Sequence, residues 1–161
     1  MTGAGSRSPV SCGRGMTEDD RWQLIISLEE THLKGGVVLS EWCSFITRGA
    51  DIAFAKGAFL ASILTATAAI EAYLKSEYGD PQKPHQNLAS LIDQSTLDEA
   101  HKADLHRLRK CRNFWVHIKQ PWEDAQILDQ PEKYDTELEE MALFAAKLLR
   151  RTFFEPSNQF V

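Results

Sequence analysis

The sequence has few cysteines and no long apolar run. Its 161 residues include three cysteines, Cys12, Cys43 and Cys111. An odd number at such wide spacing indicates neither a disulfide framework nor a zinc site, so we expect reduced thiols in a cytoplasm. The longest stretch without charge, Gly57 to Ile70, is too short to span a bilayer and contains Ser and Thr. The sequence therefore predicts no membrane span.

An excess of basic charge is also missing. The formal net charge is −5, which argues against a protein that coats DNA without specificity. The charge is uneven, because residues 101–119 contain six Lys or Arg, three His and one acid, whereas residues 123–140 contain eight acids and one Lys. The basic strip could hold a phosphate backbone. The alternative interpretation is two solvated helix faces of opposite sign.

No segment has the pattern of a β-strand, and no internal repeat is found. Apolar residues recur at helical spacing instead, which predicts an all-α bundle of five to six helices with an up-down four-helix core. Residues 1–16, rich in Gly and Ser, are expected to be a disordered leader, with Met16 as an alternative start of translation. A single domain is expected over residues 17–156, followed by a frayed tail over 157–161.

Residues typical of helix ends divide this domain. Thr17, followed by three acids, is an expected N-cap, and Ser40 is another. The segments Thr96–Glu99 and Thr136–Glu139 predict capping boxes for the last two helices. The expected helices cover residues 18–34, 41–48 with a junction or kinked continuation beyond Gly49, 58–78, a short segment within 85–93, a helix ending at Pro121, and a last helix ending near Phe154.

The segment RKCRNFWVHIKQP, from Arg109 to Pro121, carries the most unusual residues. On a helical wheel, Arg112 lies at the edge of an apolar face that includes Leu105, Leu108 and Trp115. Beside that face runs a ridge with no acid and no apolar residue. The residues of the ridge are Lys102, His106, Arg109, Lys110, Asn113 and His117.

Two features of this helix need a reason. A guanidinium at the edge of the core needs an acid, because an unpaired buried charge is costly, and we predict that Glu71 pairs with or orients Arg112. Asn113 is a poor helix former, and it is four residues from His117, whose imidazole suits proton transfer near neutral pH. The alternative is that these residues make ordinary surface or interface contacts. The other histidines are interpreted as simple polar surface; they are His32, His85, His101 and His106.

The hexapeptide RNFWVH resembles the signature of the HEPN domain (higher eukaryotes and prokaryotes nucleotide-binding), which is Arg, a polar residue, three variable residues and His. Here these positions are Arg112, Asn113 and His117. The small-residue-rich segment AFLASILTATAAIEAYLK and the short segment HQNLASLID resemble the helices that precede the motif in that family. The resemblance covers residues 40–154, so the helix expected over 18–34 lies outside it.

The resemblance implies a homodimer in which two motif helices face each other and form a composite cleft for single-stranded RNA. It implies metal-independent cleavage, without a cofactor, in which the 2′-OH of the RNA attacks the adjacent phosphate. His117 would then move a proton, Arg112 would stabilise the phosphorane oxygens, and Asn113 would hold the His or the phosphate. The basic residues expected to attract the RNA backbone are Lys102, His106, Arg109 and Lys110.

Three functions stay open from the sequence. The first is an endoribonuclease in a toxin–antitoxin or antiphage setting, with an antitoxin or a nucleotidyltransferase as partner. The second is a non-catalytic HEPN subunit that binds a nucleotide or a regulatory partner. The third is a helical bundle without a ligand, in which RNFWVH only holds a dimer together.

Overall fold

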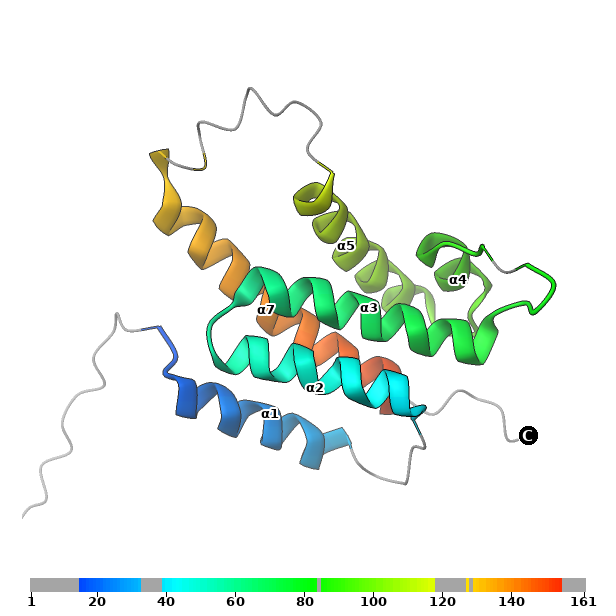
Figure 1. Cartoon of the computed structure of the whole chain (residues 1–161), viewed down its shortest axis with the longest axis horizontal. Helices are drawn as coiled ribbons and strands as arrows, with labels where there is room; N and C mark the ends of the chain where they lie inside the picture. Colours follow the sequence, from blue (N-terminus) through cyan, green and yellow to red (C-terminus); the bar gives the residue numbers. More distant parts are fainter. Residues whose placement is uncertain (1–14, 33–38, 84, 118–126, 128, 155–161) are drawn as a thin grey trace, which may run out of the picture.

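The computed structural model describes residues 15–32, 39–83, 85–117, 127 and 129–154. The described part is all-α and contains no strand, which confirms the predicted fold class (Figure 1). Nearly all of the predicted leader and the predicted tail lie outside the described residues. The helices are α1 (Glu18–His32), α2 (Glu41–Ala55), α3 (Phe59–Tyr78), α4 (Leu88–Gln94), α5 (Glu99–Val116) and α7 (Pro131–Phe154).

The core lies between an antiparallel helix pair and the helices that cover it. α2 and α3 are joined by a short turn at Gly57, whose φ of 76° suits a residue without a side chain. α7 packs against both, α1 covers α2 and α7, and α5 packs against α3 and α7 with α4 beside it (Figure 1). The largest apolar side chains at the centre are Phe54, Ile63, Ile70, Leu74, Leu91, Ile92, Leu105, Leu108 and Leu149.

The predicted caps of the first two helices are confirmed. Thr17 and Asp20 cap α1 reciprocally, because the Thr17 hydroxyl accepts from the Asp20 N–H at 3.2 Å and the Asp20 carboxylate accepts from the Thr17 N–H at 2.9 Å. Ser40 Oγ accepts from the Cys43 N–H at 3.1 Å. α2 then continues through Gly49 to Ala55, so the glycine does not end it.

The two predicted Thr-x-x-Glu capping boxes are wrong. α5 is capped by Asp98, two residues after Thr96, and the side chain of Asp98 accepts from the His101 N–H at 2.9 Å. α7 begins at Pro131, a residue favoured at the first helical position because its nitrogen needs no partner there. Thr136 is therefore inside the helix, where its hydroxyl donates to the Glu132 carbonyl at 2.9 Å.

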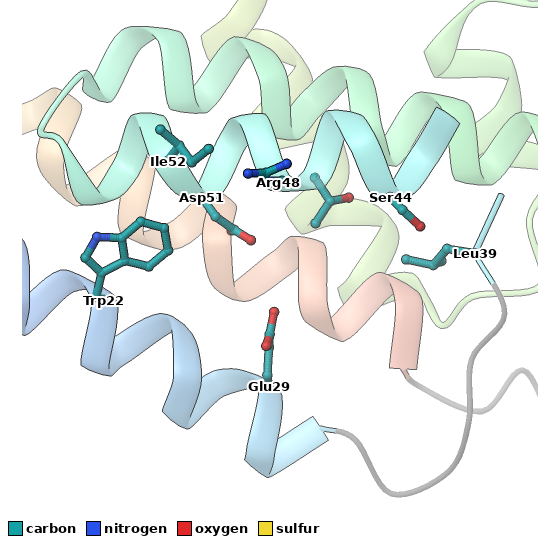
Figure 2. Close-up of a pocket in the computed structure, with 8 residues that line it drawn as sticks. Trp22, Glu29, Leu39, Ser44, Arg48, Asp51 and Ile52 are labelled. Carbon is teal, nitrogen blue, oxygen red and sulfur yellow. The ribbon is translucent and has the colours of Figure 1, made fainter. Parts of the chain in front are cut away.

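One arginine is buried in this fold together with its acids. Arg150 of α7 is 2% exposed, and its guanidinium lies 2.7 Å from Asp51 Oδ1 of α2 and 3.2 Å from Glu29 Oε1 of α1. Figure 2 shows Asp51 and Glu29 projecting toward each other from α2 and α1. Burial raises the pKa of Asp51 despite the nearby cation. Burial would lower the pKa of Arg150, but both carboxylates outweigh it and raise that pKa.

We expect Arg150→Met to destabilise the fold strongly, because it leaves the carboxylate of Asp51 buried without a cation. Loss of one partner of a buried pair costs about 3–5 kcal/mol. Glu29→Gln should cost less than about 1 kcal/mol, since that carboxylate side chain is 45% exposed. Urea unfolding followed by circular dichroism gives these free energies. Arg150→Met combined with Asp51→Leu should recover most of the loss, and an equal loss in the double variant would contradict this account.

Candidate functional site

The start of α5 is fixed by contacts that position the rest of the motif helix. Asp98 caps the helix, and the hydrogen bond from the His101 N–H is the main reason that the pKa of Asp98 is lowered. The ring of His101 is fully buried, and its Nε2 lies 3.0 Å from the Thr152 hydroxyl of α7. Arg151 lies 3.5 Å from Asp98 and 3.2 Å from Asp104. The interpretation of His101 as polar surface is therefore wrong.

Near the end of α5 the side chains of two motif residues, Arg112 and Asn113, are in contact. Arg112 Nη1 donates to Asn113 Oδ1 at 3.0 Å, and the backbone N–H of His117 donates to the Asn113 carbonyl at 3.0 Å. Arg112 and Asn113 are half-buried, whereas His117 is exposed. The bond to His117 is the ordinary backbone bond of a helix end, which any residue at position 113 would make. Only the side-chain bond to Arg112 gives a physical reason for an asparagine at this helical position.

The prediction that this helix continues to Pro121 is wrong, because α5 ends at Val116. His117 is its C-cap, with φ −111° and ψ 87°, outside the helical region. The direction of the imidazole is therefore not fixed by the helical wheel. Residues 118–121, the rest of the expected helix, lie outside the described residues.

The predicted pair between Glu71 and Arg112 is not formed. Among the ion pairs of the described residues, all with N···O of 4.0 Å or less, none joins these two side chains. Arg112 is half-buried and its recorded hydrogen bond goes to Asn113, so it does not need a buried acid. The arginine that does need one is Arg150. Its position among Leu148, Leu149 and Phe153 was the available signal.

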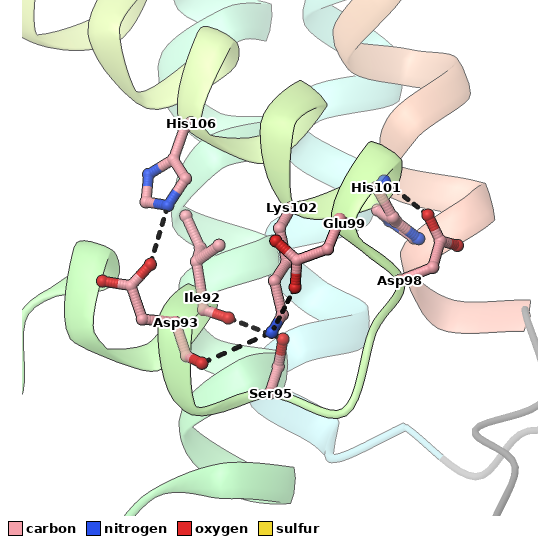
Figure 3. Close-up of polar contacts among 8 residues, drawn as sticks. All are labelled: Ile92, Asp93, Ser95, Asp98, Glu99, His101, Lys102 and His106. Atoms are coloured by element: carbon pink, nitrogen blue, oxygen red, sulfur yellow. Dashed lines mark hydrogen bonds and ion pairs between the residues drawn. The ribbon is translucent and has the colours of Figure 1, made fainter.

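The predicted basic ridge divides into two parts. Lys102 Nζ lies 3.3 Å from Glu99 Oε1 and 3.5 Å from the Asp93 carbonyl, and His106 Nε2 lies 2.9 Å from Asp93 Oδ1 (Figure 3). These two side chains are thus engaged by acids at the junction of α4 and α5. Further along the ridge, Arg109 and Lys110 have no ion pair among the described residues.

Those two cations lie close to the motif and differ in exposure. Arg109 Nε is buried, and within the described part of the chain it has no hydrogen-bond partner. Lys110 is exposed. The positive charge available to an anion is therefore concentrated in the turn that precedes Asn113 and His117.

Aromatic side chains surround the same end of α5. Phe114 is 66% exposed, as expected of a residue that points away from the apolar face, and Val116 is 45% exposed. The ring of Phe114 meets Trp115 edge to face at 5.4 Å, and Trp115 meets Tyr134 of α7 in the same way at 6.0 Å. Trp115 is half-buried, so it belongs to the margin of the core.

A groove of about 580 Å³ lies elsewhere, between α1 and α2 (Figure 2). Its two carboxylates, Glu29 and Asp51, are already held by Arg150. It contains none of the motif residues, and its lining residues are Trp22, Glu29, Leu39, Ser44, Thr47, Arg48, Asp51 and Ile52. Within the described ranges, no group of three or more His, Cys, Asp or Glu side chains is placed to hold a metal ion.

Fold and site together define a helical-bundle protein with a polar, cation-bearing helix end. Residues 49–154, about two-thirds of the chain, match the family described as Domain of unknown function (DUF4145), and the chain belongs to this family. The match includes the motif residues and excludes α1. No curated protein and no solved structure is significantly similar to the chain. None of the described helices is long and apolar enough to cross a membrane.

We expect Asp98→Ala to lower the melting temperature more than Thr96→Ala, because Asp98 caps α5. The pKa of Asp98 is lowered in the folded protein, so its stabilisation is present at neutral pH and is lost as the pH falls through that folded-state pKa. The difference between wild type and Asp98→Ala should therefore shrink in acid. Melting curves at several pH values measure this. A larger effect of Thr96→Ala than of Asp98→Ala would indicate that Thr96 is the N-cap of α5.

Proposed function

We propose that this protein is a metal-independent endoribonuclease of HEPN type that cleaves single-stranded RNA. The observation that carries the proposal is the 3.0 Å hydrogen bond from Arg112 to the side chain of Asn113, beside the exposed His117 at the end of α5. Two of the three signature residues are thus in side-chain contact. Lys110, which is exposed and has no ion pair among the described residues, lies in the turn before them.

The proposed reaction is a transesterification within the RNA. The 2′-oxygen forms a bond to the adjacent phosphorus, and the bond from phosphorus to the 5′-oxygen breaks. The 2′-OH loses one proton and the leaving 5′-oxygen gains one, which leaves a 2′,3′-cyclic phosphate and a 5′-OH. The exposed imidazole of His117 is suited to one of these transfers. Arg112 would donate hydrogen bonds to the phosphorane oxygens, and Asn113 keeps its guanidinium in place.

A second copy would complete the site. Two proton transfers occur on opposite sides of the phosphorus, and one chain supplies one motif histidine. If two α5 ends meet across a two-fold axis, the second copy supplies another His117 and another Arg112. The exposed Phe114 and Val116 at that end provide apolar area for such a contact. The homodimer is therefore part of the proposal.

An assay with purified protein, single-stranded RNA and EDTA tests this function. Wild type should yield cyclic phosphate ends, and His117→Ala should reduce the rate by about 10²–10⁴-fold. Arg112→Ala should cost about 10²–10³-fold, a range typical of lost transition-state stabilisation. His85→Ala, at an exposed histidine outside the helices, is the matched control and should cleave like wild type. If both motif variants cleave at the wild-type rate, the activity belongs to another site or to a contaminant.

RNA affinity should depend on Lys110 more than on Lys102. Lys110 is exposed without an ion pair in the described part of the chain, whereas Lys102 is held by Glu99 and the Asp93 carbonyl. We expect Lys110→Ala to weaken binding of a 2′-O-methyl RNA, which is not cleaved, and to reduce the salt slope of log K by about one. Lys102→Ala should change the slope less. Fluorescence anisotropy at several salt concentrations measures both, and the reverse order would exclude the proposed RNA path.

A second candidate function is a non-catalytic HEPN subunit that binds a nucleotide or a regulatory partner. The engagement of Lys102 and His106 by acids favours it, because those cations are then less available to a long RNA. An inert wild type that binds a nucleotide or a nucleotidyltransferase would establish this alternative.

For the ribonuclease we propose a cytoplasmic toxin–antitoxin or antiphage setting, with an antitoxin as partner. The free thiols of Cys43 and Cys111 agree with a reducing compartment.

A further inference from the structure

The outer face of α2 holds two aromatic rings in solvent. Trp42 is 70% exposed, Phe45 is 73% exposed and Ile52 is 40% exposed. Together with Gly49 they follow one another at intervals of three, four and three residues, within an arc of about 80° on the helix. We name Trp42, Phe45, Gly49 and Ile52 the α2 seam. Contiguous exposed apolar residues of this kind mark interaction surfaces.

The surface next to the seam on α3 is uncharged. A methyl group added at Gly49 would lie 3.5 Å from Thr65 Cγ2, so the two helices are close at this point. Ala61 and Ala68, both exposed, lie about one turn to either side of Thr65 on α3. Glu41 and Arg48 are exposed on α2 beside the seam, but the α3 side offers a strongly charged segment no counter-charge. The partner that fits this face is itself apolar.

The spacing of the seam makes it complementary to a second copy of itself. Its intervals of three, four and three residues are symmetric about position 47, so an antiparallel copy presents the same spacing. When two α2 helices pack antiparallel around a two-fold axis, Phe45 lies opposite Gly49 and Trp42 lies opposite Ile52. A large ring thus faces a residue without a side chain, as a knob faces a hole. We propose that the α2 seam joins two copies of this chain in an antiparallel, two-fold contact.

The exposed area is sufficient for such a contact. A fully buried aromatic side chain removes about 150–250 Å² from solvent, so the exposed parts of Trp42 and Phe45 amount to roughly 250–300 Å² per copy. Two copies, with Ile52 included, would bury roughly 600–700 Å² of apolar area. That is about the apolar share of the smallest stable interfaces, which bury about 1,200 Å² in total.

The α2 seam is separate from the motif end of α5 and does not depend on the proposed ribonuclease. Trp42 and Phe45 also precede the residues that match the family model, which begins at Gly49. A chain with one two-fold contact through α2 and another through α5 would form closed tetramers or longer assemblies. A chain with the α2 contact alone would form dimers.

Light scattering of the full chain, with circular dichroism to verify helicity, tests the contact. Phe45→Ser should halve the particle mass if wild type is a dimer or a tetramer, and should reduce longer assemblies to dimers. It should raise the dissociation constant of the α2 contact by about tenfold or more. Gly49→Gln places a side chain where the ring of the other copy would lie, and should halve the mass too. Ile26→Ser removes a comparably exposed apolar residue of α1 and should leave the mass unchanged. A monomeric wild type, or seam variants with the wild-type mass, would overturn the proposal.

Cross-linking tests the antiparallel register. In a parent with Cys12 and Cys111 replaced by Ser, Arg48→Cys and Glu41→Cys each add one exposed thiol beside the seam, while Cys43 is buried. In the antiparallel contact the two copies of position 48 lie about 3 Å apart along the helix axis, and those of position 41 about 18 Å. A short bismaleimide should therefore cross-link two Arg48→Cys chains but not two Glu41→Cys chains. Efficient linking through position 41 would indicate parallel packing and contradict the antiparallel contact.

Discussion

The ion cluster of Arg150, Asp51 and Glu29 is the constraint on which the packing of this protein depends. It joins α7, α2 and α1 at one point, where an unpaired charge would cost more than most single mutations do. A buried ion pair of this kind adds little net stability compared with apolar side chains of the same size. We infer that its effect is on specificity, because a shifted register of the three helices would separate the carboxylates from the guanidinium. The Arg150→Met, Asp51→Leu double variant measures the stability side of this balance, because it removes both buried charges.

The motif end of α5 depends on the other end of the same helix. Asp98, His101 and Arg151 hold the first turns of α5 to α7, while Leu105 and Leu108 fix its rotation against the core. The last turn has fewer such contacts, and it leaves Phe114, Val116 and the C-cap residue His117 exposed. This division suits a site in which reacting groups must be accessible while the helix that carries them stays rigid.

The sequence was sufficient to predict the helical class and the caps at Thr17 and Ser40, because both depend on local spacing. It was insufficient where two local solutions compete, as at Thr96 and Asp98, which lie two residues apart and can each cap a helix. The burial of His101 depends on Thr152, fifty-one residues away. The Glu71 prediction applied a sound rule about buried charge to the wrong arginine. The apolar neighbours of Arg150 in the sequence indicated its burial, but only tertiary packing shows that Asp51 and Glu29 are its partners.

The weak attachment of α1 has a consequence for how the protein opens. Of its fifteen residues only Ile25 is buried, while Trp22 and Leu24 are partly buried against the core. Further contacts are polar, through Arg21 to the Ala55 carbonyl and Glu29 to Arg150. Such an element belongs to the low end of local stability, where amide protons exchange by sub-global opening. Its release would leave Arg150 with Asp51, a pair of zero net charge, so the remaining bundle could stay folded while α1 is detached.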